Sequence, residues 1–214
     1  MHVADLDGDA AKAVADEIDG VAHEVDLTEG IDGLPESVDI LVNNAGLQHV
    51  APIHEFPPEM FARLQQVMVT APFLLIRRFL PGMYAQGWGR IVNISSAHGL
   101  RASAFKSGYV AAKHALEGLS KVTALEAAPH GVTSNCVNPG YVRTRLVEDQ
   151  IAAQAEAHGI STDEVIERII LDRPAVKRLI DPDDVADVVL WLCGPHSGHV
   201  TGASIAMDGG WTAS

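Results

Sequence analysis

The feature that most constrains the fold is the alternation of short β-branched runs with longer helical segments along the 214 residues. This pattern predicts strands at residues 2–5, 21–27, 38–46, 89–97, 132–140 and 203–210. Helices are predicted at residues 9–19, 57–86, 107–126 and 181–194. Strands that alternate with helices form parallel sheets covered on both faces. We therefore expect one α/β domain over residues 1–214.

A more polar, alanine-rich stretch interrupts this alternation between residues 143 and 175. It follows a predicted strand whose end is marked by Pro139 and Gly140, and it carries no strand pattern of its own. Parallel α/β sheets bind ligands beyond the carboxyl ends of their strands. We expect this stretch to form a helical lid over an active site.

The charge balance argues against nucleic acid as a partner. The chain has 28 acidic and 15 basic residues, a formal charge of −13, and no basic stripe that would attract a phosphate backbone. No apolar run approaches the ~20 residues that span a bilayer, and the N-terminus lacks a signal-peptide pattern. Cys136 and Cys193 have apolar neighbours and no metal-ligand spacing, which predicts buried thiols in a reducing cytosol. We expect a cytoplasmic protein without a metal site or membrane contact.

The stretch SGYVAAK places Tyr109 four residues before Lys113. On a helix these two side chains project from the same face. An ammonium near a phenol favours the phenolate and lowers the tyrosine pKa from ~10, so that the side chain can exchange a proton with a substrate hydroxyl. The same spacing also occurs where a tyrosine lies beside a solvated lysine, so the pair alone does not establish catalysis.

Three further motifs favour the catalytic interpretation. Ser96 ends a predicted strand thirteen positions before Tyr109, LVNNAG occupies residues 41–46, and NPGYVRT occupies residues 138–144. Together with the tyrosine and lysine, these motifs resemble the short-chain dehydrogenase/reductase family over essentially the whole chain. The resemblance implies a Rossmann-like, doubly wound parallel sheet and a nicotinamide cofactor. It further implies Tyr109 as general acid/base, Ser96 as hydrogen-bond partner of the reacting oxygen, and Lys113 as the residue that lowers the tyrosine pKa and holds the nicotinamide ribose.

The resemblance also implies the remaining cofactor contacts. Taken alone, NNAG is equally typical of a simple turn. An acidic residue at the end of the first predicted strand would bind two ribose hydroxyls and repel a 2′-phosphate, which favours NAD over NADP. Aspartate also caps helices well, and Asp7 or Asp9 can fill that role while Asp5 binds the ribose. The cofactor-binding residues implied in this way are Asp5, Asp26, Leu27, Asn43, Ala45, Gly46, Tyr109, Lys113, Pro139, Val142 and Thr144.

Two features depart from the family pattern. The family opens with a strand and a Gly-x-x-x-Gly-x-Gly turn that cradles the pyrophosphate, whereas this chain begins on what resembles the second strand. We expect an N-terminally truncated fragment or a misassigned start codon, with unpaired strand edges in the middle of the sheet. Met68 stands where the family has an asparagine whose main-chain carbonyl holds a water. Methionine is a core filler, so the helix irregularity that exposes this carbonyl is in question.

Longer stretches resemble one branch of the family. NNAGLQHVAPI, SSAHGLRASAFKSGYVAAK and AMDGGWTAS are similar to segments of bacterial D-3-hydroxybutyrate dehydrogenases. That resemblance implies NAD-dependent hydride transfer between D-3-hydroxybutyrate and acetoacetate, and a small hydroxy-acid or keto-acid as the partner. One cation and several neutral donors suit such a carboxylate. The implied substrate-binding residues are Gln48, Ser96, His98, Lys106, Tyr109, Tyr141 and Gln150.

Two aromatic positions bear on the shape of this site. Tyr141 replaces a tryptophan of the branch, so an aromatic wall is kept but its shape changes. Trp211 resembles a residue that closes a neighbouring subunit's pocket, and ordinary interface packing explains it equally well. The resemblance implies a homotetramer built on the helix that begins near Tyr109 and on the C-terminal strand.

Two other functions fit the same residues. In one, the protein reduces another small ketone, and His98 and Lys106 are incidental to it. In the other, the chain is a non-catalytic remnant that cannot bind NAD without the glycine-rich loop.

Overall fold

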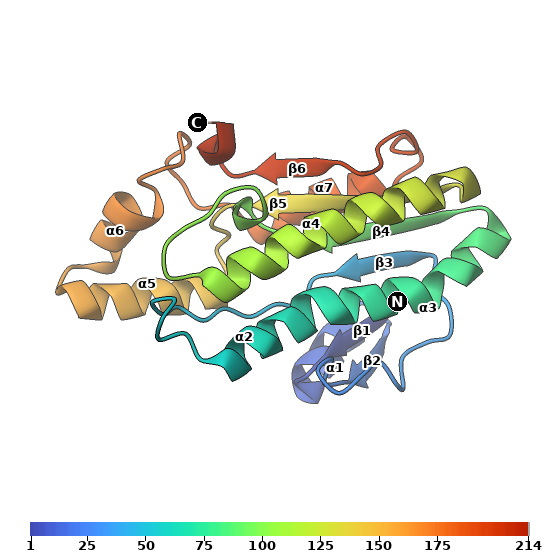
Figure 1. Cartoon of the computed structure of the whole chain (residues 1–214), viewed down its shortest axis with the longest axis horizontal. Helices are drawn as coiled ribbons and strands as arrows, with labels where there is room; N and C mark the ends of the chain where they lie inside the picture. Colours follow the sequence, from blue (N-terminus) through green and yellow to red (C-terminus); the bar gives the residue numbers. More distant parts are fainter. Residues whose placement is uncertain (214) are drawn as a thin grey trace.

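A four-stranded parallel sheet organises the computed structural model (Figure 1). The structure describes residues 1–213, apart from the side chains of Leu146, Asp149, Ala153, Gln154, Ala157 and His158. The sheet order is β3-β4-β5-β6, and the bounds are β3 (Ile40–Asn43), β4 (Gly89–Ile94), β5 (Val132–Pro139) and β6 (Ser204–Met207). All eight residues of β5 are buried, as expected for a central strand covered on both faces.

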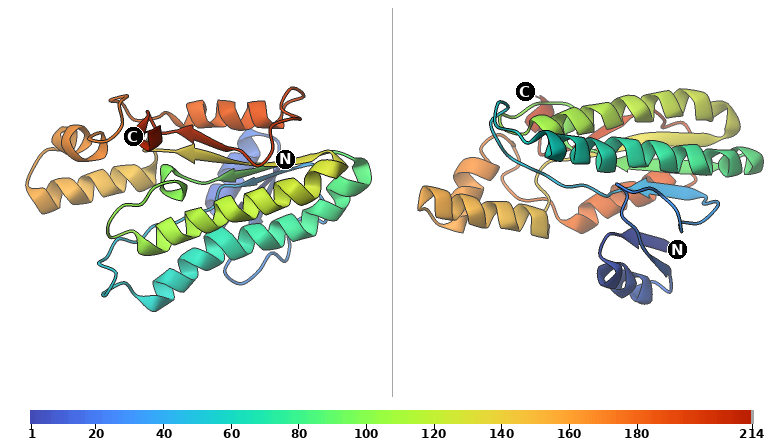
Figure 2. Two further views of the ribbon diagram at one scale, coloured as in Figure 1. Left: turned by 45° about the horizontal axis from the view of Figure 1, so that its top comes forward. Right: turned by 60° about the horizontal axis from the view of Figure 1, so that its bottom comes forward.

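A smaller unit precedes this sheet in the chain. It consists of β1 (His2–Asp5), α1 (Gly8–Glu17) and β2 (Val21–Glu24), and its two strands pair in parallel with each other. Asp7 caps α1, accepting from the main-chain N–H groups of Asp9 and Ala10 at 3.1 and 3.0 Å. Within the described residues β1 pairs with β2 alone and β3 with β4 alone. The expected unpaired edges are therefore present, and Figure 2 shows the small unit beside the larger sheet.

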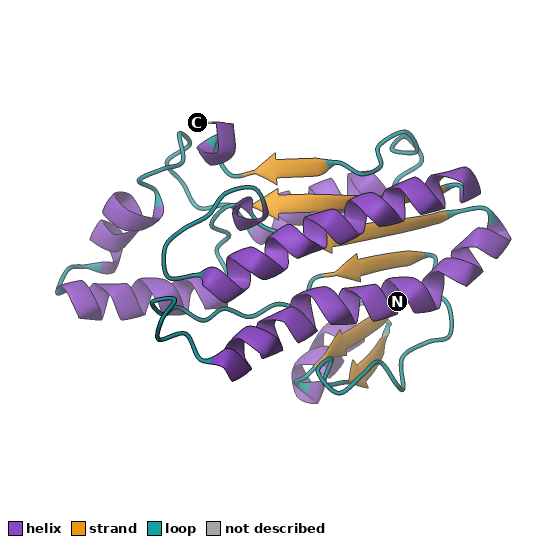
Figure 3. Ribbon diagram, viewed as in Figure 1, coloured by secondary structure: helices purple, strands orange, loops and turns teal. Residues whose placement is uncertain are grey.

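Helices cover both faces of the larger sheet (Figure 3). One face carries α2, α3 and α4, and the other carries α7, as the alternation of strands and helices predicts. A π-helix, η1 (Gln66–Thr70), joins α2 to α3, so the helix predicted at residues 57–86 is continuous but irregular. The bounds are α2 (Pro58–Gln65), α3 (Ala71–Gln86), α4 (Ser107–Ala127) and α7 (Pro182–Cys193). Among the described helices, none is long and apolar enough to cross a membrane.

The region predicted as a lid is helical and lies beyond the carboxyl ends of the strands (Figure 1). It comprises α5 (Arg145–His158), α6 (Thr162–Val165) and the π-helix η4 (Ile166–Ile170). It has its own apolar cluster of Ile151, Val165, Ile170, Leu171 and Leu179, against which Tyr141 packs. The segment therefore has an internal core and is attached to the sheet near the end of β5.

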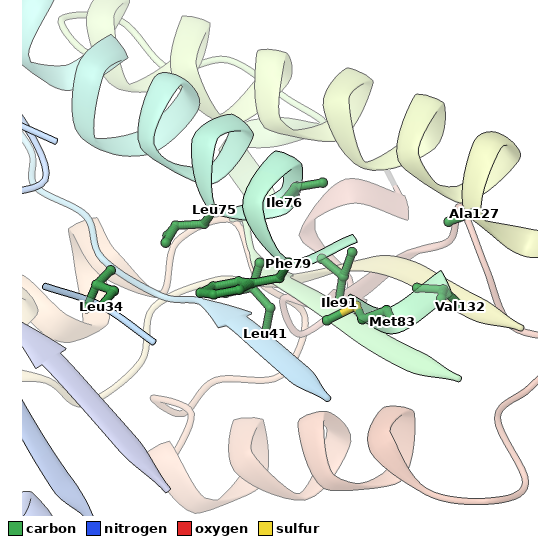
Figure 4. Packing of buried hydrophobic residues seen from close by; sticks show 9 residues of the cluster. All are labelled: Leu34, Leu41, Leu75, Ile76, Phe79, Met83, Ile91, Ala127 and Val132. Atoms are coloured by element: carbon green, nitrogen blue, oxygen red, sulfur yellow. The ribbon is translucent and has the colours of Figure 1, made fainter. Parts of the chain in front are cut away.

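The main core lies between α3 and the sheet. Figure 4 shows Leu75, Phe79 and Met83 of α3 on the side of the helix that faces the strands, and Ile76 belongs to the same buried cluster. These side chains hold the sheet rigid, and the strand ends that carry the polar residues are fixed with it. Of the two predicted buried thiols, Cys136 is buried, but Cys193 is partly exposed because it lies in the last turn of α7.

Candidate active site

Two strand ends and a short turn bring Ser96 to the edge of the sheet. Ser96 follows β4 and caps the 3₁₀ turn η2 (Ala97–Gly99), where its Oγ accepts from the main-chain N–H of His98 at 3.2 Å. Its hydroxyl also lies 3.5 Å from the carbonyl oxygen of Pro139, at the end of β5. The motifs predicted at residues 96 and 139 therefore meet at one site.

Tyr109 and Lys113 lie in the first two turns of α4, on the face that the spacing predicts. The Lys113 ammonium is 5.6 Å from the centroid of the Tyr109 ring. It also donates a hydrogen bond of 2.7 Å to the main-chain carbonyl of Ile94, at the end of β4. The two side chains are thus held at the carboxyl end of the central strands, as the sequence predicts.

The ionisation of this pair differs from the expectation. Burial lowers the pKa of Lys113 to about 8, although Cys136 and Glu117 act in the opposite direction. Burial raises the pKa of Tyr109, and the Ser96 hydroxyl only partly offsets this effect. The predicted lowering of the tyrosine pKa is therefore wrong for the chain alone, because desolvation of the phenolate outweighs the opposing hydrogen bond from Ser96.

His98 forms one wall of the site as a neutral ring. Burial, with smaller contributions from Lys106, Arg173 and His114, lowers its pKa to about 4. Its Nε2 is 3.0 Å from the Ser103 hydroxyl, and its ring meets the rings of Tyr109 and Trp211 edge to face, at 5.9 and 5.1 Å. At neutral pH this imidazole has one N–H donor, one acceptor nitrogen and no charge.

Two cations flank an aromatic stack beside His98. The rings of Tyr141 and Trp211 are 6.3 Å apart and within 6° of parallel. The Lys106 ammonium lies 5.7 Å from the centre of the Tyr141 ring, and the Arg173 guanidinium lies 5.7 Å from that of Trp211. Burial lowers the pKa of Lys106 below its usual range. This arrangement suits an anion that neutralises a desolvated ammonium.

Gln48 and Gln150 complete the predicted substrate set. Gln48 follows β3 and Gln150 lies in α5, and Nε2 of Gln150 is 3.4 Å from Oε1 of Gln48. The Nε2 atom of Gln48 is itself buried without a hydrogen-bond partner among the described residues. A buried amide donor without a partner is costly in a protein alone and suits a polar ligand.

The predicted cofactor residues fall into two groups. On the larger sheet, Asn43 donates 2.8 Å to Asn93, which leaves Oδ1 of Asn43 without a partner among the described residues. A Cβ built on Gly46 would be 3.8 Å from the Lys113 ammonium, so the NNAG segment reaches the lysine. Ala45 is exposed nearby.

Two predicted cofactor positions lie between the end of β5 and the start of α5. Val142 bridges to Ile180, and Thr144 is the N-cap of α5.

The other group lies on the smaller unit. Asp5, at the end of β1, accepts 2.9 Å from the main-chain N–H of Asp7, and its side chain is exposed. Asp26 follows β2, where hydrogen bonds from Thr28 lower its pKa, and Leu27 comes next. Asp26, Thr28 and Arg63 line an open hollow of about 630 Å³. The structure does not bring Asp5 and Asp26 into contact with Tyr109 or Ser96.

Arg173 and Ser103 were missed by sequence reasoning. Ser103 lies five residues after His98 in an irregular loop, where spacing carries no information. Arg173 lies near the end of the lid region, and only a search for an extra cation there would have found it. A separate cavity of about 380 Å³ is lined in part by Tyr141, Leu171 and Asp208.

Comparisons with known proteins agree with this geometry. A family model described as "Enoyl-(Acyl carrier protein) reductase" matches residues 9–212. The D-beta-hydroxybutyrate dehydrogenase of Rhizobium meliloti is 50% identical over 175 residues, which cover 82% of this chain and 68% of the relative. The Cupriavidus necator protein of the same name is 46% identical over 175 residues, with the same two coverages of 82% and 68%. A solved structure, a 4-hydroxyisoleucine dehydrogenase mutant complexed with NADH and succinate, superposes with a TM-score of 0.86 at 27% identity, covering 100% of this chain and 88% of that one.

Proposed function

This chain belongs to the short-chain dehydrogenase/reductase family, and from that premise we propose that it interconverts D-3-hydroxybutyrate and acetoacetate with NAD. The observation that carries the proposal is that His98 lies against Tyr109 while the Lys106 ammonium acts on His98 and lies over the Tyr141 ring. Gln48 adds a buried amide donor that has no partner among the described residues. A desolvated ammonium and an unpartnered buried amide are the groups that a small carboxylate would satisfy. The names of the similar proteins support the same substrate.

The proposed roles follow from the contacts. Tyr109 exchanges a proton with the substrate hydroxyl, and its position in α4 fixes where the phenol oxygen lies relative to the substrate. Ser96 holds the reacting oxygen, because its hydroxyl is anchored at the strand end by the His98 main chain. Lys106 pairs with the carboxylate, while neutral His98 and the two glutamines fix its orientation without adding charge.

The residues present fit a nicotinamide cofactor. The unpartnered Oδ1 of Asn43 and the approach of Gly46 to Lys113 provide polar groups at the strand ends where the family binds its dinucleotide. Pro139, Val142 and Thr144 would hold the nicotinamide end, and Asp26 and Leu27 the adenine. When bound, the nicotinamide accepts or supplies the hydride. We propose NAD over NADP because Asp5, an exposed carboxylate at the end of β1, would repel a 2′-phosphate.

Three broader features belong to the same proposal. Residues 143–175 act as a lid, because α5 carries Gln150 to Gln48 across the site. The protein acts as a homotetramer in the cytoplasm. Exposed apolar side chains on α4, Val122 and Leu125, support such an assembly.

Replacing Lys106 by alanine tests the substrate. We expect KM for D-3-hydroxybutyrate to rise about 100-fold, since a desolvated charge partner is lost, while KM for a neutral ketone of similar size stays unchanged. The matched control is Lys121→Ala on the exposed side of α4. An unchanged preference for the carboxylate substrate in the Lys106 variant would exclude the proposal and favour a reductase of other small ketones.

A measurement of NAD binding distinguishes the dehydrogenase from the second candidate, a non-catalytic remnant. Titration calorimetry of the 214-residue chain with NAD measures the affinity directly. Micromolar binding supports the dehydrogenase, and the absence of binding at millimolar NAD favours the remnant.

A further inference from the structure

A carboxylate lies beneath the site, and none of the roles proposed above uses it. Glu117 is in α4, one turn after Lys113, and only 4% of its surface is exposed. Carboxylates are seldom buried to this degree unless they are paired or fully hydrogen-bonded. The hydrogen bonds of Glu117 therefore indicate its role.

Glu117 joins α4 to two neighbouring strands. Its Oε1 accepts from Nδ2 of Asn138, in β5, at 2.6 Å, and its Oε2 accepts from the hydroxyl of Ser204, in β6, at 2.5 Å. Short hydrogen bonds to an ionised acceptor are stronger than neutral ones. The carboxylate thus fixes the helix to the sheet at the level of the site.

The same network reaches the turn that carries Ser96 and His98. The Nδ2 atom of Asn138 also donates to the main-chain carbonyl of Ser96 at 3.0 Å. Because both neighbours of this amide nitrogen are acceptors, the orientation of the Asn138 side chain is fixed. A Cβ on Gly99 would come within 3.0 Å of Oε1 of Glu117, so the turn packs directly on the carboxylate.

The carboxylate also acts on Lys113. Two titratable groups act on this ammonium among the described residues: Cys136, on β5, and Glu117, on the same helix. The ammonium also lies 5.6 Å from the centroid of the Tyr109 ring. Burial lowers the pKa of Lys113 to about 8, and Glu117 opposes that fall. Since Cys136 is itself a neutral thiol whose pKa burial raises to about 12, Glu117 supplies the negative charge.

We propose that Glu117 is a positioning residue that holds the Ser96 turn against α4 through Asn138 and keeps Lys113 positively charged, without touching the substrate. The inference rests on the proposed proton transfer by Tyr109. A carboxylate that served packing alone would be replaceable by glutamine, because glutamine keeps the shape, accepts from Asn138 and donates to the Ser204 hydroxyl.

The test compares Glu117→Gln with Glu126→Gln, a matched change on the exposed face of the same helix. The first measurement is an NMR titration of protein carrying ¹³C-labelled lysine, without substrate or cofactor, with the Lys113 signal assigned from Lys113→Arg. We expect the midpoint of Lys113 to fall by about 1 pH unit in Glu117→Gln, because a nearby negative charge is lost, and to stay in Glu126→Gln.

The second measurement is steady-state kinetics at pH 7. We expect kcat to fall about tenfold in Glu117→Gln with KM nearly unchanged, because the site is loosened without loss of a substrate contact. Glu117→Asp keeps the charge but shortens the side chain, so the Lys113 midpoint should return to the wild-type value while kcat recovers only in part.

The proposal is overturned if the Glu117→Gln protein matches Glu126→Gln in both the Lys113 midpoint and kcat. If Glu117→Gln does not fold, the test falls to Glu117→Asp, and a wild-type kcat in that variant overturns the proposal. The titration needs no substrate, so a shifted midpoint in a protein that does not oxidise D-3-hydroxybutyrate would reject the proposed function and keep the inference about the charge of Lys113.

Discussion

Gln150 in α5 donates a long hydrogen bond of 3.4 Å to Gln48, which lies 102 positions earlier in the chain. This contact ties the proposed lid to the loop after β3. At that length the hydrogen bond is weak, so its contribution to lid closure depends on whether a ligand draws the two side chains together.

We expect the two glutamines to be coupled in substrate binding. Gln48→Ala and Gln150→Ala should each raise KM for D-3-hydroxybutyrate about fivefold with little change in kcat, because each removes a donor from the bound carboxylate. The double variant should lose less than the product of the two, with a coupling of about 0.5–1 kcal/mol. Steady-state kinetics of all four proteins measures this coupling, and strictly multiplicative effects would show that the lid does not close through this pair.

Gly99 should be intolerant of a side chain. A Cβ there would lie 2.5 Å from Oγ of Ser95 and 3.0 Å from Oε1 of Glu117, so Gly99→Ala should lower the free energy of unfolding by about 1–3 kcal/mol. Gly118, in α4, has open space around the same position, and Gly118→Ala should be neutral or stabilise by up to about 1 kcal/mol. Urea titration of both variants decides the matter, and equal effects would contradict the packing described for the turn.

His98 should make the fold sensitive to acid. Its pKa is about 4 in the folded protein against an ordinary value near 6.5. Above pH 6.5 the ring is neutral in both states, but as the pH falls toward 4 only the unfolded chain takes up the proton. Stability is therefore lost across this window, by up to about 3 kcal/mol from this residue.

The measurement is the free energy of unfolding between pH 7 and 4 for the wild type and for His98→Gln. The variant should lose less stability than the wild type on acidification, and His199→Gln, at an exposed position before β6, serves as the matched control. If His98→Gln and the wild type lose stability in parallel, the ring is not held neutral.

The order of elements was predictable because parallel α/β folds alternate two simple periodicities. Each predicted strand and helix is present, with shifts of a few residues at the ends. Unpaired strand edges were expected in the middle of one sheet, but the division into two sheets was not predicted. A helix irregularity near Met68 was implied by the family resemblance and put in question by the methionine, and it is present as the π-helix at Gln66–Thr70. Met68 lies within it, 1% exposed and packed in the core, so the irregularity is present with methionine at this position.

The placement of site residues was predictable where it depends on local spacing along the chain. Properties that depend on burial by distant segments, such as pKa values, were not predictable. Four residues on a helix place Tyr109 above Lys113 whatever surrounds them. Their pKa values depend on desolvation by segments distant in sequence, and for that reason the predicted direction for Tyr109 was wrong. Arg173 escaped notice for the same reason, because it reaches Trp211 through the end of the lid region.

The raised pKa of Tyr109 predicts opposite pH profiles for the two directions of the proposed reaction. Reduction of acetoacetate needs the protonated phenol, so its kcat should stay flat from pH 6 to 9. Oxidation of D-3-hydroxybutyrate needs the phenolate, so its kcat should rise with pH by up to tenfold per unit and show no plateau below pH 9. Because the Ser96 hydroxyl lowers the pKa of Tyr109, Ser96→Ala should move the oxidation profile to still higher pH as well as reduce kcat. Stopped-flow measurement of NADH consumption with acetoacetate and of NADH formation with D-3-hydroxybutyrate, between pH 6 and 10, tests both statements. An oxidation rate that levels off below pH 8 would show that the phenol of the working enzyme is more acidic than its burial implies.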